Sequence, residues 1–261
     1  MTPSRTSRRL ILGITGAIFA IPIVGMIEYT LRGGIGGGYS ADRWVRVFTG
    51  GLDNSYRVMW QAIGNSILLS VLTMLIVLVL LVPTMVLVHL RFPRLQPVLE
   101  FVCILPISIP AIAMVVGLAP VYSVVSRIFG SGAWTLCFAY GVLVLPFAYR
   151  AIHGNLTGVD VRTLAEAARS LGAGWGTVIA RILLPNIRRG LLAASVIACA
   201  VVLGEFTIAS LLNRNNLQTA LLVIQASDPF IAIIFTLLAL AFAFGLLLIL
   251  GRAGATTRRR K

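Results

Sequence analysis

The sequence is poor in acidic residues and nearly devoid of lysine. Its 261 residues include 8 acidic and 22 basic side chains, and Lys261 is the only lysine. The phosphate-binding loop of P-loop ATPases needs a lysine beside a glycine-rich turn, and the glycine-rich stretch 33–38 contains none. This chain therefore cannot hold ATP in such a loop. Any active process must draw its energy from another chain or from an ion gradient.

Cysteine and histidine are also scarce. Cys103, Cys137 and Cys199 lie in apolar stretches and form no C-x-x-C pair, so the sequence predicts neither a disulfide framework nor a thiolate metal site. His89 and His153 have no metal-binding or catalytic spacing around them. We therefore expect no metal, no cofactor and no catalytic residue in this chain.

Long apolar runs are abundant. The chain is 58% hydrophobic and only 11% charged, with a mean hydropathy of +0.96, whereas a soluble domain is about 25% charged. Apolar runs of 18 or more residues indicate membrane helices. The basic lead-in of the first run also fits a signal peptide, but the run is long for one, and we expect an uncleaved span. The sequence predicts an all-α membrane protein whose six spans cover about 10–29, 62–90, 98–125, 133–151, 190–212 and 229–250.

The arginines predict how these spans are oriented. With the N-terminus inside, 16 basic residues fall on the cytoplasmic side and 6 on the outer side, as the positive-inside rule requires. Both termini are then cytoplasmic. The domain plan is a short tail (1–9), a six-helix membrane domain (10–251) and a basic tail (252–261) that contacts anionic lipid. This accounts for the net charge of +14 without nucleic acid.

One cytoplasmic loop, about 154–189, is charged and rich in glycine. Asp160 is placed to cap a helix, and Thr157 precedes it by three residues, as in a capping arrangement. Gly172 and the glycines after it end this helix. A second short helix is expected over 177–184, ending near Pro185. The apolar positions of the first helix share one face, namely Val161, Leu164, Ala165, Ala168 and Leu171.

An apolar stripe needs a partner, and the pattern alone leaves two open. One is the protein's own cytoplasmic surface, and the other is a groove on another subunit.

The spacing of particular residues in this loop resembles a known family signature. Glu166-Ala167-Ala168, three residues, Gly172, nine residues, Ile182, one residue and Leu184-Pro185 match the EAA signature of ABC importer permeases at every fixed position. The chain resembles the permeases of binding-protein-dependent importers with the type I fold. The six spans, the stretch Gly64 to Ser70 and the prolines of the third span extend that resemblance over much of the chain.

The resemblance implies a function and a set of partners. In that family the loop is a coupling helix that docks into a cleft on a separate ATPase. Two such ATPase subunits would bind ATP and magnesium, and a second permease, a related chain, would complete the pathway in the bacterial inner membrane. A solute-binding protein would dock outside, on the interfacial helix expected at 40–48 or on the loop 213–228. The docking set would be Glu166, Ala167, Ala168 and Gly172, supported by Leu164, Leu171, Ile182, Leu184 and Pro185.

Candidate pathway residues lie in the third and fifth spans. Glu205 is an ionisable group at membrane depth, which predicts a functional role, and packing between helices is the alternative. Thr207 and Ser210 follow it, while Ser108 and Pro110 mark a kinked helix of the kind that lines pathways.

The solute is less well defined by the sequence. "GEF" at 204–206 resembles the branch of the family that serves polyamines, iron, thiamine and oxyanions, and a polyamine is the expected solute. Ferric iron, thiamine and an oxyanion are the alternatives. A self-contained ion-coupled transporter would instead predict inverted repeats and several intramembrane charges, and the sequence has neither.

Overall fold

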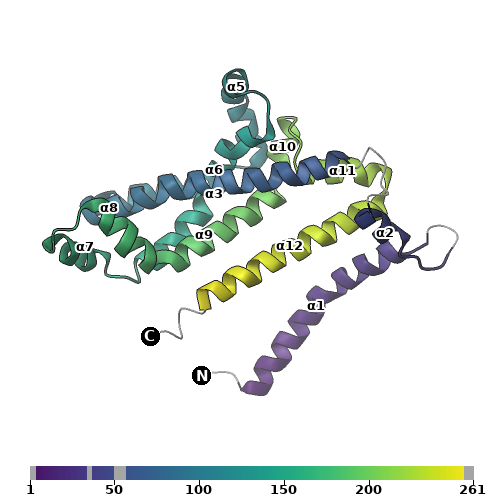
Figure 1. Ribbon diagram of the computed structural model, residues 1–261, viewed down its shortest axis with the longest axis horizontal. Helices are drawn as coiled ribbons and strands as arrows, with labels where there is room; N and C mark the ends of the chain where they lie inside the picture. Colours follow the sequence, from purple (N-terminus) through teal and green to yellow (C-terminus); the bar gives the residue numbers. More distant parts are fainter. Residues whose placement is uncertain (1–3, 34–36, 50–56, 256–261) are drawn as a thin grey trace. The chain divides into compact units, whose positions relative to one another are not determined.

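The computed structural model describes residues 4–33, 37–49 and 57–255, and these residues form helices joined by short turns (Figure 1). Within these ranges the only β pairing is one isolated bridge between Arg32 and Tyr39. The predicted all-α fold is therefore confirmed. The end of the basic tail, from residue 256, and residues 34–36 of the glycine-rich stretch lie outside the described residues.

The chain divides into two compact units. The first unit comprises residues 1–59 and 220–244, and the second comprises 60–219 and 245–261. The first unit contains two helices and most of two others, which are α1 (Arg5–Leu31), α2 (Asp42–Thr49), α11 (Leu217–Ser227) and α12 (Pro229–Ala255).

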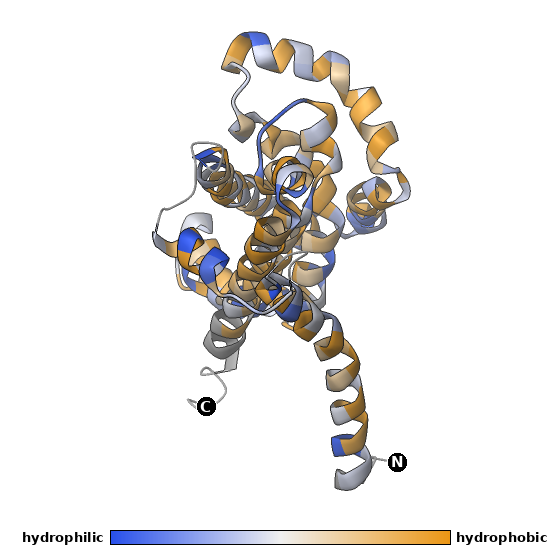
Figure 2. Ribbon diagram, turned by 90° about the vertical axis from the view of Figure 1, so that its right-hand side faces the viewer, coloured by the Kyte–Doolittle hydropathy of each residue, from blue (hydrophilic) through white to orange (hydrophobic). Residues whose placement is uncertain are grey.

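Helix α1 is apolar over most of its length (Figure 2), and its residues 6–25 are exposed. Such a surface is stable only when lipid or another chain covers it. A helix, α2, lies where the interfacial helix was predicted, over Asp42–Thr49 rather than 40–48, and its Val47 is buried. Trp44 donates a hydrogen bond of 3.0 Å from Nε1 to Oγ1 of Thr30, so α2 is fastened to the end of α1.

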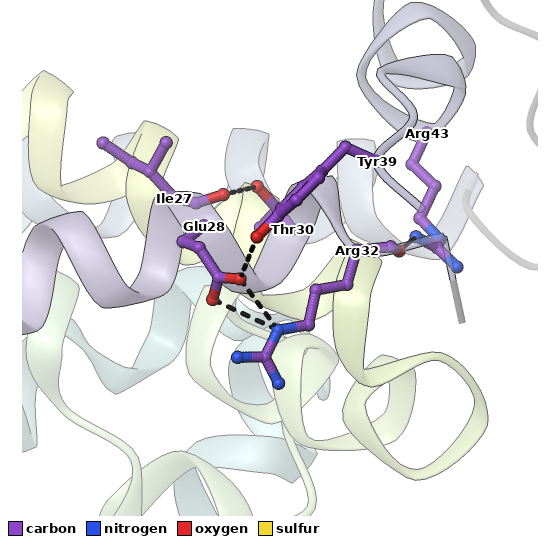
Figure 3. A network of polar contacts seen from close by, with 6 residues as sticks. All are labelled: Ile27, Glu28, Thr30, Arg32, Tyr39 and Arg43. Carbon is purple, nitrogen blue, oxygen red and sulfur yellow. Dashed lines mark hydrogen bonds and ion pairs between the residues drawn. The ribbon is translucent and has the colours of Figure 1, made fainter. Parts of the chain in front are cut away.

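A polar cluster strengthens that junction (Figure 3). The Glu28 carboxylate accepts from Nε of Arg32 at 3.0 Å and from the hydroxyl of Tyr39 at 3.1 Å. Arg43 donates to the backbone carbonyl of Arg32 and lies over the ring of Phe230, 4.0 Å from its centroid. The cluster therefore joins the end of α1, the start of α2 and the start of α12.

The second unit is built around α6 and α9, which pack along each other in Figure 1. Gly190 allows this close approach, because a Cβ there would lie 2.9 Å from Cβ of Asn155 and 3.0 Å from the carbonyl oxygen of Ala151. The helices of this unit are α3 (Arg57–Arg91, from Trp60 on), η2 (Pro93–Leu95), α4 (Gln96–Ile104), η3 (Leu105–Ser108), α5 (Ala111–Phe129), η4 (Ala133–Leu136), α6 (Cys137–Leu156), α7 (Val161–Ser170), α8 (Trp175–Thr177), η5 (Val178–Leu183), α9 (Leu184–Gly204) and α10 (Thr207–Leu211).

The third predicted span, 98–125, is interrupted among its prolines, where the sequence predicted a kinked helix, but the interruption is a full break between two helices. Helix α4 passes into the 3-10 turn η3, and the chain is extended at Ile109 (ψ 119°) before α5 begins after Pro110. The residue before a proline is driven out of the helical region, so Pro110 is the cause of the break. Pro120 is accommodated inside α5.

The fifth predicted span is shifted toward the N-terminus. The stretch Trp175–Gly204 is one apolar helical segment of 30 residues, so no separate helix ends near Pro185. Pro185 stands in the first turn of α9, where its missing N–H is tolerated, and a π-helical turn, η5, precedes it. At the other end α9 stops at Gly204, because Glu205 is extended (ψ 123°).

The described residues contain five helices that are long and apolar enough to cross a membrane. The sixth predicted span, 229–250, coincides with α12, whose described apolar stretch is Pro229–Gly245. The five are Thr6–Leu31, Arg57–Arg91, Ala111–Phe129, Ala133–Leu156 and Trp175–Gly204.

Candidate functional site

The EAA loop begins with a capped helix, as predicted. The Asp160 carboxylate accepts from the backbone N of Thr163 at 3.1 Å and from its hydroxyl at 2.7 Å. These hydrogen bonds to Thr163 hold the pKa of Asp160 below its ordinary value. Thr157 does not take part, which corrects the expected capping arrangement. Its hydroxyl donates to the carbonyl of His153 and closes the preceding helix, α6.

Most of the apolar stripe of α7 is covered by the chain itself. Val161, Ala165 and Ala168 are buried, and Leu164 is half-buried. This face packs on the π-helical turn η5. Of the two partners left open by the pattern, the protein's own surface therefore takes these residues. Ala168 in particular is turned toward its own chain.

The turn after α7 is a Schellman motif. Gly172 has φ +86°, and its N donates to the carbonyl of Arg169 at 2.9 Å, while the N of Ala173 donates to the carbonyl of Ala168 at 3.1 Å. This pair of bonds needs a left-handed residue, which glycine supplies without a Cβ penalty. The turn leaves Leu171 89% exposed, an unusual position for a large apolar side chain on a tight turn.

The outward face of the loop carries a different set of residues. Glu166 and Ala167 are exposed on it, beside Leu171 and Gly172. Glu166 forms an ion pair of 2.9 Å with Arg162, one turn earlier, and the two side chains are 66% and 73% exposed. Exposed pairs contribute little stability, so Arg162 can be exchanged for a cation on another chain at small cost.

The last three motif positions lie where the loop returns to the membrane. Ile182 and Leu184 are half-buried against the core of the second unit, while Pro185 is exposed. Asn186 donates from its side chain to the carbonyl of Ile182 at 2.7 Å. These positions shape the start of α9 rather than the outward face.

Trp175 joins the loop to a distant helix, and sequence reasoning missed it. The guanidinium carbon of Arg169 in α7 lies 4.7 Å from the centroid of its ring, and that of Arg91 at the end of α3 lies 5.7 Å from the same centroid. Arg169 and Trp175 lie in the same loop, so the sequence offered a signal for their contact. Nothing local pointed to the second, because 84 residues separate Arg91 from Trp175.

Glu205 occupies the break between α9 and α10. Its two carboxylate oxygens lie 3.1 and 3.0 Å from the backbone N of Ile208, which donates to them. The residue is buried, with 8% exposure. Glu205 is thus a helix cap at one end of the membrane domain, which the hydropathy pattern alone did not show.

A polar network holds the turn that follows α10. Buried Asn216 donates to the carbonyl of Glu205 at 2.8 Å and to the hydroxyl of Tyr140 at 3.3 Å. The stretch at the start of the second span supplies two more bonds. Asn65 donates to the carbonyl of Asn215, and the N of Leu217 donates to the hydroxyl of Ser66. The "GNS" sequence at 64–66, which is part of α3, therefore holds this turn against α3 through two hydrogen bonds.

The other pathway candidates lie in separate places. Thr207 is half-buried two residues after Glu205, and Ser210 is exposed on the same short helix. Ser108 and Pro110 are exposed at the break before α5. Within the described ranges, neither Ser108 nor Pro110 forms a hydrogen bond with Glu205, so these residues do not form one polar cluster with it.

The loop and this network lie at opposite ends of α3 (Figure 1). Ser66 and Arg91 are 25 residues apart on that helix, which is about 38 Å at 1.5 Å per residue. This length exceeds the roughly 30 Å of a bilayer's hydrocarbon core. The two polar regions therefore fit opposite faces of a membrane.

Within the described ranges, no three His, Cys, Asp or Glu side chains come together.

Comparison with known proteins agrees with this architecture. Residues 64–256 match the family model described as binding-protein-dependent transport system inner membrane component. The chain is 33% identical over 79 residues to the spermidine/putrescine transport system permease protein PotC of Escherichia coli K12, which covers 30% of each chain. It is 32% identical over 158 residues to the molybdenum transport system permease protein ModB of the same strain, covering 56% of this chain and 69% of ModB.

A second PotC, from Haemophilus influenzae, is 37% identical over 95 residues, covering 36% of this chain and 35% of that protein. The aligned parts thus span about a third of the PotC proteins and more than two thirds of ModB. Since the family model covers most of the chain, from the "GNS" stretch through α12, this protein belongs to the family of inner membrane components of binding-protein-dependent transport systems.

Proposed function

We propose that this chain forms half of the solute pathway of an ATP-driven importer and is coupled to a separate ATPase through the loop of α7 and α8. The observation that carries this is the exposed apolar side chain of Leu171, beside Ala167 and Glu166, on a turn fixed by Gly172. A short helix that presents one apolar anchor and one exchangeable charge fits a groove on a second protein. ATP and magnesium are bound by that partner.

The continuous helix Trp175–Gly204 supports a route for the coupling. It starts in the loop and runs to the break at Glu205. Closure of an ATPase pair would draw two such loops together and tilt these helices as rigid bodies, which opens the pathway on the outer side. Two permeases, two ATPases and a solute-binding protein outside complete the proposed complex. Helix α2 and the segment 213–228, which was expected as a loop but is mostly helix α11, are the proposed docking surfaces for that binding protein.

The first candidate solute is a polyamine such as spermidine or putrescine. The likeness to the PotC proteins supports it, and Glu205 is an acidic group at the outer end of α9. In this proposal Glu205 attracts the cation while its carboxylate keeps the cap on α10. Thr207 and Ser210 follow it on α10, and Ser108 and Pro110 line the break in the third span.

A second candidate, an oxyanion, is favoured by two observations. The alignment with ModB covers more of the chain than those with PotC. Arg214 donates to the hydroxyl of Ser126 at 2.7 Å, and its buried Nε has no partner among the described residues. A half-buried guanidinium without a carboxylate suits an anion.

The coupling proposal is tested by copurification from the native membrane in mild detergent. Leu171→Asn should release the ATPase while the permease stays in the membrane. Phe92→Asn is the matched control, because Phe92 is also an exposed apolar residue and directly follows the end of α3 nearest the loop. If Leu171→Asn retains the ATPase as well as the control does, the loop is not the docking surface.

The solute is tested with the assembled complex in vesicles. Spermidine and putrescine, or molybdate, delivered by the binding protein should stimulate ATP hydrolysis and accumulate inside. If molybdate stimulates ATP hydrolysis and the polyamines do not, the solute is an oxyanion rather than a polyamine. Uptake without ATP that collapses with an ionophore would instead support an ion-coupled transporter.

A further inference from the structure

Trp175 lies between two arginines that come from different helices. It is the first residue of α8, and its half-buried ring packs against the core of the second unit. The guanidinium carbon of Arg169 lies 4.7 Å from the ring centroid, and that of Arg91 lies 5.7 Å from it. Both distances are within the roughly 6 Å over which a cation is attracted to an indole face.

The two arginines belong to parts that an importer must move together. Arg169 is on α7, three residues after Glu166, and so on the helix that presents the outward face of the loop. Arg91 is the last residue of α3. The far end of α3 is bonded through Asn65 and Ser66 to the turn beyond α10. The three side chains therefore connect the loop to a helix that reaches the opposite face of the membrane.

The apolar face of α7 makes a different connection. Val161, Ala165 and Ala168 pack on η5, which continues into α9. That contact links α7 to α9. Among the cation–aromatic contacts of the described residues, those of Trp175 are the ones that tie α7 to α3.

We propose that Arg91, Trp175 and Arg169 form a clamp that passes the movement of the coupling loop to α3, with Trp175 as the positioning residue. This inference rests on the proposed function, since it assumes that an ATPase moves the loop. When the clamp is intact, α7 and α3 shift as one body. When it is broken, the ATPase still docks and hydrolyses ATP, but α3 follows the loop less closely and less solute is carried for each ATP consumed.

The experiment uses the complete transporter, reconstituted in vesicles with its ATPase and binding protein. Trp175→Leu keeps an apolar side chain but removes the aromatic face, and Trp175→Phe keeps an aromatic face. Arg91→Gln removes one cation from the exposed end of α3. Arg94→Gln is its matched control, because Arg94 is an exposed arginine three residues further on. The readouts are copurified ATPase, ATP hydrolysis without solute, and solute carried per ATP.

We expect Trp175→Leu and Arg91→Gln to lower the solute carried per ATP by roughly two- to fivefold, the effect on an equilibrium of losing one exposed cation–π contact. Copurified ATPase and hydrolysis without solute should not change. Trp175→Phe should restore most of the coupling, and Arg94→Gln should match the unmodified protein. A purely structural role would lower the amount of complex instead.

Two results would overturn the clamp. One is unchanged coupling in both Trp175→Leu and Arg91→Gln, and the other is a loss in Arg94→Gln equal to that in Arg91→Gln. If Trp175→Leu does not assemble, Arg91→Gln decides, because it alters only an exposed side chain. Failure of the proposed function has a different signature, since the unmodified chain would then bind no ATPase or would transport without ATP.

Discussion

Asn216 donates a hydrogen bond of 2.8 Å from its side chain to the backbone carbonyl of Glu205, and it thereby joins the two arms of the turn around α10. The carboxylate of Glu205 is meanwhile engaged by the backbone N of Ile208. Hydropathy places Glu205 inside a span, but its carboxylate caps α10 and its carbonyl accepts from the buried side-chain amide of Asn216. Its part in the solute pathway stays a prediction, and the cap shows how to test it.

Replacement of Glu205 can separate the cap from the charge. Glu205→Gln keeps an oxygen that accepts from Ile208 and should leave thermal stability close to that of the unmodified protein, while uptake of a cationic solute falls. Glu205→Ala should lose about 1 kcal/mol, the usual value of a cap. The measurements are melting in detergent and uptake in vesicles. Normal uptake in Glu205→Gln would show that Glu205 has a structural role and no role in solute uptake.

Asn216 should matter for stability more than any other side chain of this turn. Asn216→Leu leaves the carbonyl of Glu205 and the hydroxyl of Tyr140 without this donor, and each buried group left unpaired costs about 1–3 kcal/mol. The check is the melting temperature in detergent. Asn213→Gly is the control, because Asn213 has φ +51° and glycine adopts that conformation freely. Equal melting of the two variants would show that the network is dispensable.

Gly172 should tolerate only residues that accept a left-handed backbone. At φ +86°, Gly172→Ala carries a strain of about 1–2 kcal/mol and should weaken copurification of the ATPase. Gly172→Asn should be milder, because asparagine is the next most common residue at this turn position. Gly176→Ala is the control, since a Cβ there meets nothing within 4 Å. Similar binding in all three variants would mean that the turn geometry is not recognised.

The packing of α6 on α9 should depend on Gly190. In Gly190→Ala the new Cβ meets the backbone of Ala151 at 3.0 Å, and overpacking of this kind costs about 1–3 kcal/mol. Gly204→Ala has open space at the same atom and serves as the control. The yield and melting temperature of the purified chain should fall for the first variant alone.

The cap on α7 predicts a flat pH dependence over the working range. Hydrogen bonds to Thr163 hold the pKa of Asp160 below its ordinary value, so its contribution is complete above that value and is lost only as the pH falls through the lower, folded-state pKa. ATPase docking through α7 should therefore not change between about pH 5 and pH 8 on account of Asp160, whose ordinary pKa is about 3.9. Binding assays on Asp160→Asn, which keeps a capping oxygen, should give the same plateau. A midpoint near neutral pH in the unmodified protein, absent from this variant, would contradict the assignment.

Several features could be predicted from the sequence because they depend on neighbours along the chain. Apolar runs of sufficient length indicated the membrane helices, and the spacing from Glu166 to Pro185 indicated the family. Asp160 was placed as a cap and Gly172 as the turn residue, since both roles depend on residues within one helical turn. These inferences did not require knowledge of the tertiary contacts.

Tertiary structure decided the rest. Hydropathy averages over a window and could not locate the break at Glu205, where one backbone angle ends a helix inside an apolar run. The prolines of the third span predicted a kink, but not the full break at Pro110. The pattern likewise could not choose which side of α7 is covered, and packing on η5 buried Ala168 and left Leu171 exposed. The contact of Trp175 with Arg91, like that of Asn216 with Tyr140, joins residues far apart in the chain, and only folding brings them within reach.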